Sequence, residues 1–170
     1  MKIGFTCSSF DLCHAGHVLL FKEAKEHCDY LIVGLQDDPS VDNDINIEYR
    51  GKLKNRPVMT LAERRIILEG IKYIDEIFTY RDEEDLYKNI ERLHREGRYQ
   101  IRFIGEDYRG RQYTGHDIPH TIYYIRRDHG YSTTELRNRV HEAEVAERQK
   151  QAVSLEQAPL KTSGSVEAFA

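Results

Sequence analysis

Two histidines three positions apart are the residues of this chain best suited, by type and spacing, to do chemistry. His14 and His17 flank Gly16 within residues 10–17, which read FDLCHAGH. Imidazoles titrate at about pH 6.5 and can donate hydrogen bonds to an anion, and Gly16 lets that anion approach the backbone without a Cβ in the way. A single histidine would more often cap a helix or lie on the surface, and a metal ion would need a third ligand that no nearby spacing offers. The pair with glycine between them predicts an anion-binding turn.

The elements on either side of this turn strengthen that interpretation. Residues 3–7 form an apolar run typical of a strand, and residues 18–28 carry apolar side chains four apart, as a helix does. A turn from strand to helix exposes unpaired backbone N–H groups at the positive end of the helix dipole. Asp11 also lies in this turn, and phosphate would repel it. We therefore expect Asp11 to hold backbone, to orient an imidazole or to bind Mg²⁺.

The rest of the chain alternates between strand-like and helix-like segments. Further strands are predicted at residues 29–36, 74–80, 101–105 and 121–125. Further helices are predicted in the segments that begin at residues 60, 82 and 132, the last with Leu136, Val140 and Ala143 as its inner stripe. Residues 37–56 are predicted to be one long loop.

This alternation predicts an α/β fold, a Rossmann-like, doubly wound parallel sheet of about five strands. It would form a single domain over residues 1–148, followed by a flexible tail over 149–170. Ligands of such sheets bind at the carboxyl ends of the strands. The charged or glycine-rich turns at those ends are residues 14–17, 52–54, 105–107 and 127–133.

Several residues of these turns suit phosphate. Lys52 and Lys54 can neutralise charge that develops during transfer, although a solvated basic loop is an equally good interpretation of either alone. Arg127 offers a fork of donors, and Ser132 and Thr133 open a helix whose hydroxyl and N–H groups can hold phosphate or simply cap it. Together they predict one phosphate site along one edge of the sheet.

Composition sets limits on the class of protein. The chain has 170 residues and a formal net charge of -4, which does not favour general nucleic-acid binding. No apolar run is long enough to span a membrane, and no signal peptide is evident. An odd number of cysteines (Cys7, Cys13 and Cys28) without a Cys-x-x-Cys pair favours reduced thiols and a cytoplasmic protein.

The motifs also resemble those of a known family. Residues 10–17 resemble the HxGH signature of the nucleotidyltransferase superfamily, and residues 127–134 resemble its second signature, RTxGISTT in the cytidylyltransferase branch. In the part of the chain between these two signatures, residues 56–59, 63–64 and 72–77 also resemble the family. The resemblance covers about residues 1–141, and the most similar group is the glycerol-3-phosphate cytidylyltransferase-like proteins.

The resemblance implies transfer of CMP from CTP, accompanied by Mg²⁺, to a small phosphorylated or phosphonate acceptor, with release of pyrophosphate and no covalent enzyme intermediate. It also implies a homodimer. The catalytic residues it implies are His14, His17, Lys52, Lys54 and Arg127. The nucleotide contacts it implies are Ser8, Ser9, Phe10, Asp11, Gly16, Arg64, Gly105, Glu106, Asp107, Ser132 and Thr133. Mg²⁺ would be carried by the triphosphate, with Asp11 as the one candidate protein ligand.

The segment Tyr108–His120 departs from the short version expected in that group. We expect Arg109, Arg111 and His116 in this segment to help choose the acceptor. Two alternatives stay open. One is an adenylyltransferase acting on a sugar phosphate, and the other is a non-catalytic nucleotide-binding protein, disfavoured because the histidines, lysines and Ser-Thr pair occur together.

Overall fold

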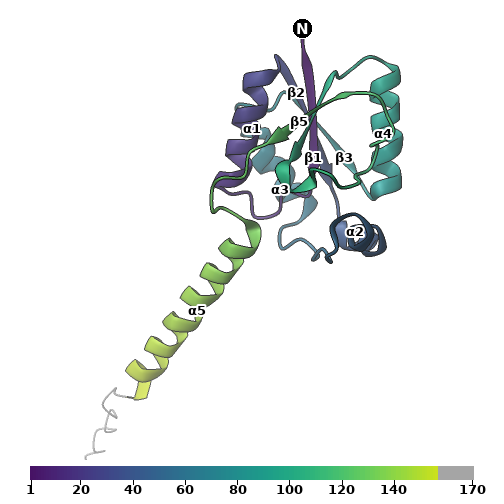
Figure 1. The fold of residues 1–170 in the computed structure, drawn as a ribbon. Coiled ribbons are helices and arrows are strands. Elements are labelled where there is room, and N and C mark those ends of the chain that lie inside the picture. The colour runs from purple at the N-terminus through teal and green to yellow at the C-terminus, as the bar shows by residue number, and fades with distance from the viewer. Residues whose placement is uncertain (157–170) are drawn as a thin grey trace, which may run out of the picture. The chain divides into compact units, whose positions relative to one another are not determined.

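The computed structural model describes residues 1–156, and its centre is a sheet of five parallel strands in the order β3-β2-β1-β4-β5 (Figure 1). The strands are β1 (Ile3–Ser8), β2 (Tyr30–Gln36), β3 (Glu76–Tyr80), β4 (Ile101–Gly105) and β5 (Thr121–Ile125). All four neighbouring pairs are parallel. The predicted Rossmann-like, doubly wound sheet is therefore confirmed.

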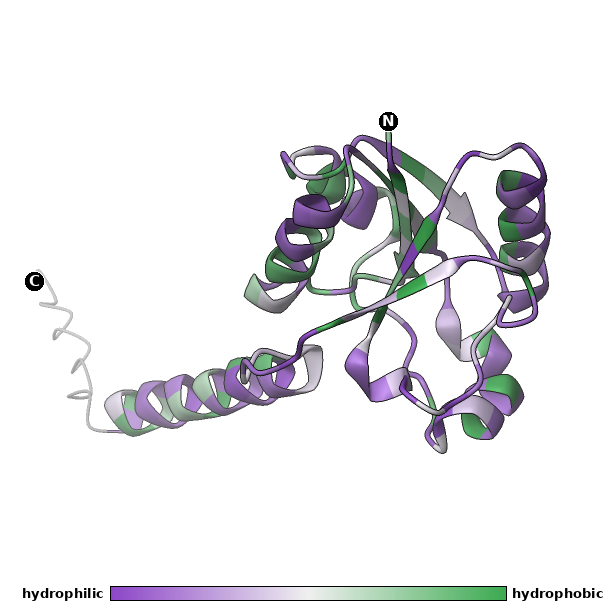
Figure 2. Cartoon of the chain, turned by 45° about the horizontal axis from the view of Figure 1, so that its top comes forward, coloured by the Kyte–Doolittle hydropathy of each residue, from purple (hydrophilic) through white to green (hydrophobic). Residues whose placement is uncertain are grey.

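Helices cover both faces of the sheet because the strands are apolar on both faces. On one face, Phe21 of α1 (Ala15–His27) and Leu68 of α3 (Leu61–Glu69) pack into a core cluster with Phe103. On the other face, Leu86 and Ile90 of α4 (Glu83–Arg95) join a second cluster. Figure 2 shows the hydrophobic colour gathered on the strands and on parts of these helices.

The chain reverses its direction of travel across the sheet at β1. From β1 it proceeds to β2 and β3 on one side, and then crosses to β4 and β5 on the other. Parallel pairing of β1 with β4 is limited to Gly4 with Ile101 and Phe5 with Arg102. The ladder thus ends before the carboxyl ends of these strands, at the switch point where ligands of such sheets bind.

Residues 37–56 are not one long loop, contrary to the sequence prediction. They contain a 3₁₀ turn at Pro39–Asp42 and helix α2 (Asn43–Arg50). The one buried residue of this helix is Asn46, whose side chain donates to the carbonyl of Pro39 in the preceding turn at 2.8 Å. Gly51 ends the helix with φ 69°, a left-handed conformation that favours glycine.

The chain divides into two compact units, residues 1–133 and the part that begins at Thr134. Helix α5 (Thr133–Glu156) makes up the described portion of the second unit, so helix continues beyond the predicted domain end at residue 148. No residue of α5 is buried, and Val140 is 60% exposed. The inner stripe predicted for this helix stays a prediction. The remainder of the predicted tail, 157–170, lies outside the described residues.

Candidate active site

His14 and His17 form the N-terminal cap of α1. The Nδ1 of His14 accepts the backbone N–H of Gly16 at 3.1 Å, and the Nδ1 of His17 accepts the N–H of His14 at 3.4 Å. The two rings stack with centroids 4.0 Å apart. Because Nδ1 of each ring is an acceptor, the proton of each neutral imidazole lies on Nε2. Helix capping and ligand binding are thus compatible roles, since capping uses Nδ1 of each ring and not Nε2.

The turn before these histidines is strained and firmly held. Phe10 and Leu12 have φ of 46° and 47°, values uncommon outside glycine. The carboxylate of Asp11 accepts the backbone N–H groups of Val58 and Met59 at 2.9 and 3.0 Å. The backbone-holding role expected for Asp11 is confirmed, and both carboxylate oxygens are occupied by it.

Phe10 was expected to contact the nucleotide, but its side chain is only 1% exposed and lies in the core. Its ring meets the edge of His17 with centroids 5.4 Å apart. Phe10 therefore packs against the imidazole of His17 and helps to position it. Ser8 and Ser9 lie half-buried at the carboxyl end of β1, in place for a ligand at this edge.

Arg64 was also expected near the base and ribose, and the structure assigns it another role. It is 2% exposed, and its guanidinium donates to the carbonyl oxygens of Ser9, Gln36, Asp37 and Met59 at 2.6 to 3.1 Å. A buried guanidinium that is hydrogen-bonded in this way cannot turn to a ligand without leaving carbonyls unpaired. Arg64 thus fixes the turn before α1 to the end of β2 through these hydrogen bonds.

Helix α2 positions the basic loop that follows it. Asn43, at the start of the helix, accepts the backbone N–H of Lys54 at 2.8 Å and donates to its carbonyl at 3.4 Å. Lys54 is half-buried, whereas Lys52 is exposed. The sequence alone does not distinguish the two lysines, but their environments in the structure differ.

An ion-paired cluster connects α2 with the ends of β4 and β5. Asp107 lies between two arginines: Arg50 contacts its Oδ2 at 3.1 Å, and Arg127 contacts its Oδ1 at 3.2 Å. The guanidinium of Arg50 also lies over the ring of Tyr108, 4.8 Å from its centroid. Arg50 and Asn43 are site residues that the loop interpretation missed. In the sequence, Arg50 is marked only as one of four cations within residues 50–56, which are Arg50, Lys52, Lys54 and Arg56.

Thr133 closes the site on the β5 side. Its hydroxyl lies 3.3 Å from Nε2 of His14 and donates to the carbonyl of Asp11 at 3.4 Å. Ser132, beside it, is half-buried. A Cβ at Gly16 would lie 2.9 Å from the rings of both His14 and His129, so only glycine fits between them.

His129 is a third histidine at this turn, and sequence reasoning did not single it out. Its Nδ1 is buried without a hydrogen-bond partner among the described residues, and its ring stacks on Tyr131 with centroids 5.4 Å apart. Its other side lines a shallow hollow of about 170 Å³ against α1, with Glu26 and Arg126. Neither His14 nor His17 lines that hollow, so it is not the phosphate site.

The charges around His17 make this site suitable for an anion. Burial, the ring of His14 and the cations Arg127 and Lys54 lower the pKa of His17 to about 3. His17 is therefore neutral at physiological pH and acts as a donor through Nε2–H. An entering anion would reverse the unfavourable field of these cations.

The same field acts on Lys54. Burial, with Arg50 and Lys52 close by, lowers its pKa to about 8. Repulsion among cations of this kind is relieved by a ligand that carries several negative charges, such as a triphosphate.

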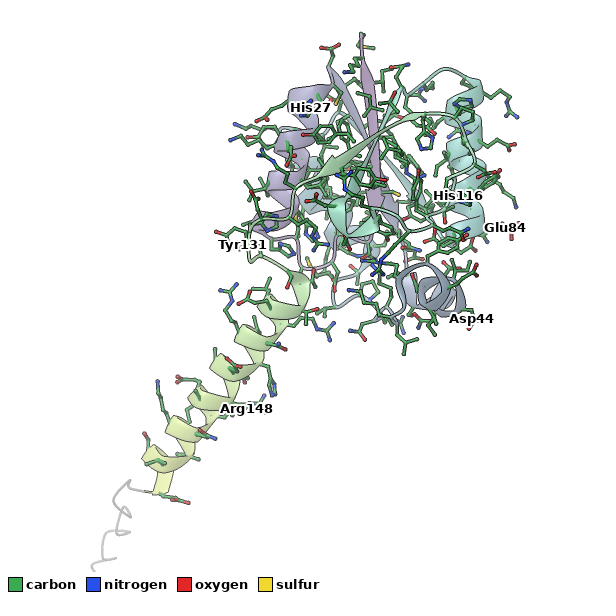
Figure 3. All side chains as sticks on the ribbon, viewed as in Figure 1. His27, Asp44, Glu84, His116, Tyr131 and Arg148 are labelled. Carbon is green, nitrogen blue, oxygen red and sulfur yellow. The ribbon has the colours of Figure 1, made fainter. Side chains whose placement is uncertain are left out.

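The residues expected to choose the acceptor are only partly brought to the site. Arg111 reaches the carbonyl of Arg50 at 3.0 Å. Arg109 instead lies over the ring of Tyr124 and pairs with the exposed Glu106 at 3.5 Å. His116 is exposed and hydrogen-bonds within its own turn; Figure 3 shows it toward α4, away from Tyr131 near α1.

A buried arginine that the sequence did not indicate lies beneath this segment. Arg102 of β4 is 3% exposed, donates to the carbonyl of Thr114 and lies 4.9 Å from the ring centroid of Tyr113. Its Nε has no hydrogen-bond partner among residues 1–156.

The described residues contain no group of three or more side chains arranged to hold a metal ion. Within the same residues, no helix has the length and apolar character needed to cross a bilayer.

A parallel sheet with cations and paired imidazoles at its switch point defines the class of nucleotide-binding α/β enzymes. Comparison with known proteins narrows this class. The family model described as cytidylyltransferase-like matches residues 5–139. The bifunctional protein HldE of Campylobacter curvus is 32% identical over 143 residues, 84% of this chain and 28% of that protein. HldE of Wolinella succinogenes is 33% identical over 135 residues, 79% of this chain and 26% of that protein.

This chain thus spans a little over a quarter of the length of these HldE proteins. Among solved structures, the lipopolysaccharide core biosynthesis protein from Thermoplasma volcanium superposes with a TM-score of 0.48 at 19% identity, covering 85% of this chain and 89% of that one. The chain belongs to the cytidylyltransferase-like family of HxGH nucleotidyltransferases.

Proposed function

We propose that this enzyme transfers CMP from CTP to a phosphate or phosphonate oxygen of a small metabolite and releases pyrophosphate. The observation that carries the proposal is the pair of stacked imidazoles at the start of α1, with Lys54 and Arg127 close enough to lower the pKa of His17. Donors fixed in this way can stabilise the negative charge that develops on the α-phosphate during transfer.

In the proposed reaction, an acceptor oxygen forms a bond to the α-phosphorus as the bond from that phosphorus to the bridging oxygen breaks. Pyrophosphate leaves with the electron pair. His14 and His17 donate from Nε2 to the α-phosphate, while Lys54 and Arg127 balance the charge of the triphosphate. We assign to Lys52, Ser132 and Thr133 a supporting role in holding the triphosphate. Because no covalent enzyme intermediate is needed, positioning and charge account for the catalysis.

Magnesium is proposed only as the companion of the triphosphate. Among the described residues no protein ligand set fits it, and the carboxylate oxygens of Asp11 already accept two backbone N–H groups. Mg²⁺ keeps much of its water and binds readily through substrate phosphates, which is the arrangement we propose.

The choice of base and acceptor is the finer part of the proposal. The resemblance of residues 127–134 to the second signature of the cytidylyltransferase branch supports CTP as the nucleotide. Transfer of AMP to a sugar phosphate is the second candidate, because the HxGH turn at residues 14–17 does not by itself determine the base. A homodimer and a cytoplasmic location also remain proposals, and light scattering tests the first of them.

The experiment is a pyrophosphate-release assay with Mg²⁺, each of the four nucleoside triphosphates, and a panel of glycerol phosphates, sugar phosphates and phosphonates. We expect release only with one matched nucleotide and acceptor, and with CTP as that nucleotide. Release with ATP and a sugar phosphate would select the second candidate. No release above the protein-free rate with any pair would contradict both.

A further inference from the structure

The carboxylate of Asp107 occupies a place between two arginines that suits a phosphate. Arg50 and Arg127 bind its two different oxygens, at 3.1 and 3.2 Å. Arginine forks match carboxylate and phosphate geometry alike, so a carboxylate in such a clamp resembles a bound phosphate group. Burial raises the pKa of Asp107, but Arg127 and Arg50 outweigh it and hold that pKa below its usual range.

The chain makes room for this arrangement at Gly105. A Cβ at that position would overlap Oδ1 of Asp107, and it would lie 3.6 Å from Cδ of Arg127. The carboxylate thus folds back over the glycine at the end of β4. If it turned away, the same glycine would leave a ligand free access to the backbone beside both arginines.

Arg50 has the features of a built binding residue. Its side chain is 13% exposed, it lies 4.8 Å over the ring of Tyr108, and it is held at the last turn of α2. Among the neighbouring cations it lowers the pKa of Lys54 most, so it belongs to the same basic cluster. Its one acidic partner within ion-pair distance among residues 1–156 is Asp107.

We propose that Asp107 is an internal stand-in for phosphate, and that the β- and γ-phosphates of the nucleotide displace it and are then clamped by Arg50 and Arg127. Arg50 is thereby a further substrate-binding residue of this enzyme. The inference rests on the proposed function, because it takes a nucleoside triphosphate as the ligand. It goes beyond that function by naming the phosphate-binding residue and the contact that must be exchanged.

The proposed exchange and a purely supporting role for Asp107 predict opposite effects of an Asp107 substitution on phosphate affinity. If Asp107 competes with phosphate, its loss strengthens binding. If Asp107 instead orients the arginines, or binds only ribose, its loss weakens binding of phosphate or leaves it unchanged. Inorganic tripolyphosphate separates these cases because it has no ribose.

The experiment measures binding of inorganic tripolyphosphate with Mg²⁺ by titration calorimetry. The variants are Asp107→Asn and Arg50→Gln, and the matched controls are Glu84→Gln and Arg81→Gln, exposed residues of the α4 region that remove the same charges. Thermal unfolding of each variant checks that it is folded. We expect Asp107→Asn to tighten binding about tenfold and Arg50→Gln to weaken it about tenfold, with both controls within about twofold of the wild type.

Weaker or unchanged binding by a folded Asp107→Asn variant would overturn the inference, as would unchanged binding by Arg50→Gln. Either result would leave the proposed function intact, provided that the wild type binds tripolyphosphate and CTP. If no variant binds tripolyphosphate and the wild type binds no nucleoside triphosphate, the proposed function and the inference both fail.

Discussion

The turn before α1 and the segment from Arg50 to Lys54 both supply donors to the same cationic site, but they are held in different ways. In the turn, Asp11 and Arg64 tie the backbone to its neighbours through hydrogen bonds to N–H and C=O groups, and the histidines cap their own helix. In the basic segment, Arg50 pairs with Asp107, the acid that we propose a ligand replaces.

This difference in how the two segments are held indicates which groups act in substrate binding and which act in the transition state. Groups fixed before the ligand arrives need no reorganisation in the transition state, so they should act mainly on kcat. Groups that exchange partners gain their contact when substrate binds, so they should act mainly on KM. Each prediction below tests this division, and they run from the largest expected effect to the smallest.

Replacing His17 by alanine should have the largest effect. We expect His17→Ala to lower kcat by about 10²- to 10³-fold while nucleotide affinity changes by less than about threefold, since its contact strengthens in the transition state. His27→Ala is the matched control, because His27 lies at the other end of α1, where its ring contacts Tyr123 (Figure 3). Equal losses in kcat and affinity would break the division.

Lysine 54 should matter more than lysine 52. Lys54→Ala should lower kcat/KM by about 10- to 100-fold, mostly through KM, because Lys54 is half-buried in the cluster. Lys52→Ala should lower it by less than about fivefold, because that side chain is exposed. Steady-state kinetics on both variants make the test, and equal losses would show that the loop is an undifferentiated basic patch.

The pH dependence of kcat/KM should report Lys54. Its pKa is about 8, so the ammonium is present below that pH and is lost as pH rises through it. We expect kcat/KM to fall by up to about tenfold by pH 9. Lys54→Arg should remove this fall because arginine stays charged. A decline that persists in Lys54→Arg would assign it to another group.

Removing the tie at Asp11 should cost stability as well as rate. Asp11→Asn replaces one acceptor oxygen by an amide that cannot accept the N–H of Val58 or Met59, so we expect a loss of about 1–3 kcal/mol in the free energy of unfolding. Chemical denaturation of this variant beside Asp44→Asn, an exposed residue of α2, provides the comparison. Unchanged stability would contradict the role given to Asp11.

The sequence revealed the sheet and the histidine turn because both depend on local signals. Apolar runs marked each strand, and glycine between two histidines marked the turn. It could not reveal α2, since Asn43 and Asn46 act through partners such as Lys54 and Pro39.

Arg64 was misread for a related reason. A cation in the first turn of a helix suggests an anion nearby, but here four carbonyl oxygens from separate segments take that place. The ion pairs of Asp107 likewise join residues far apart in the chain, and no local pattern predicts them.

The most direct test of the account is to identify the bond that is attacked. Phosphorus NMR of a complete reaction should show pyrophosphate and a nucleotidyl-linked acceptor, formed in equal amounts, as attack at the α-phosphorus requires. Orthophosphate with a nucleoside diphosphate, or a phosphorylated acceptor, would place the attack at the γ-phosphorus and contradict the role given to His14 and His17.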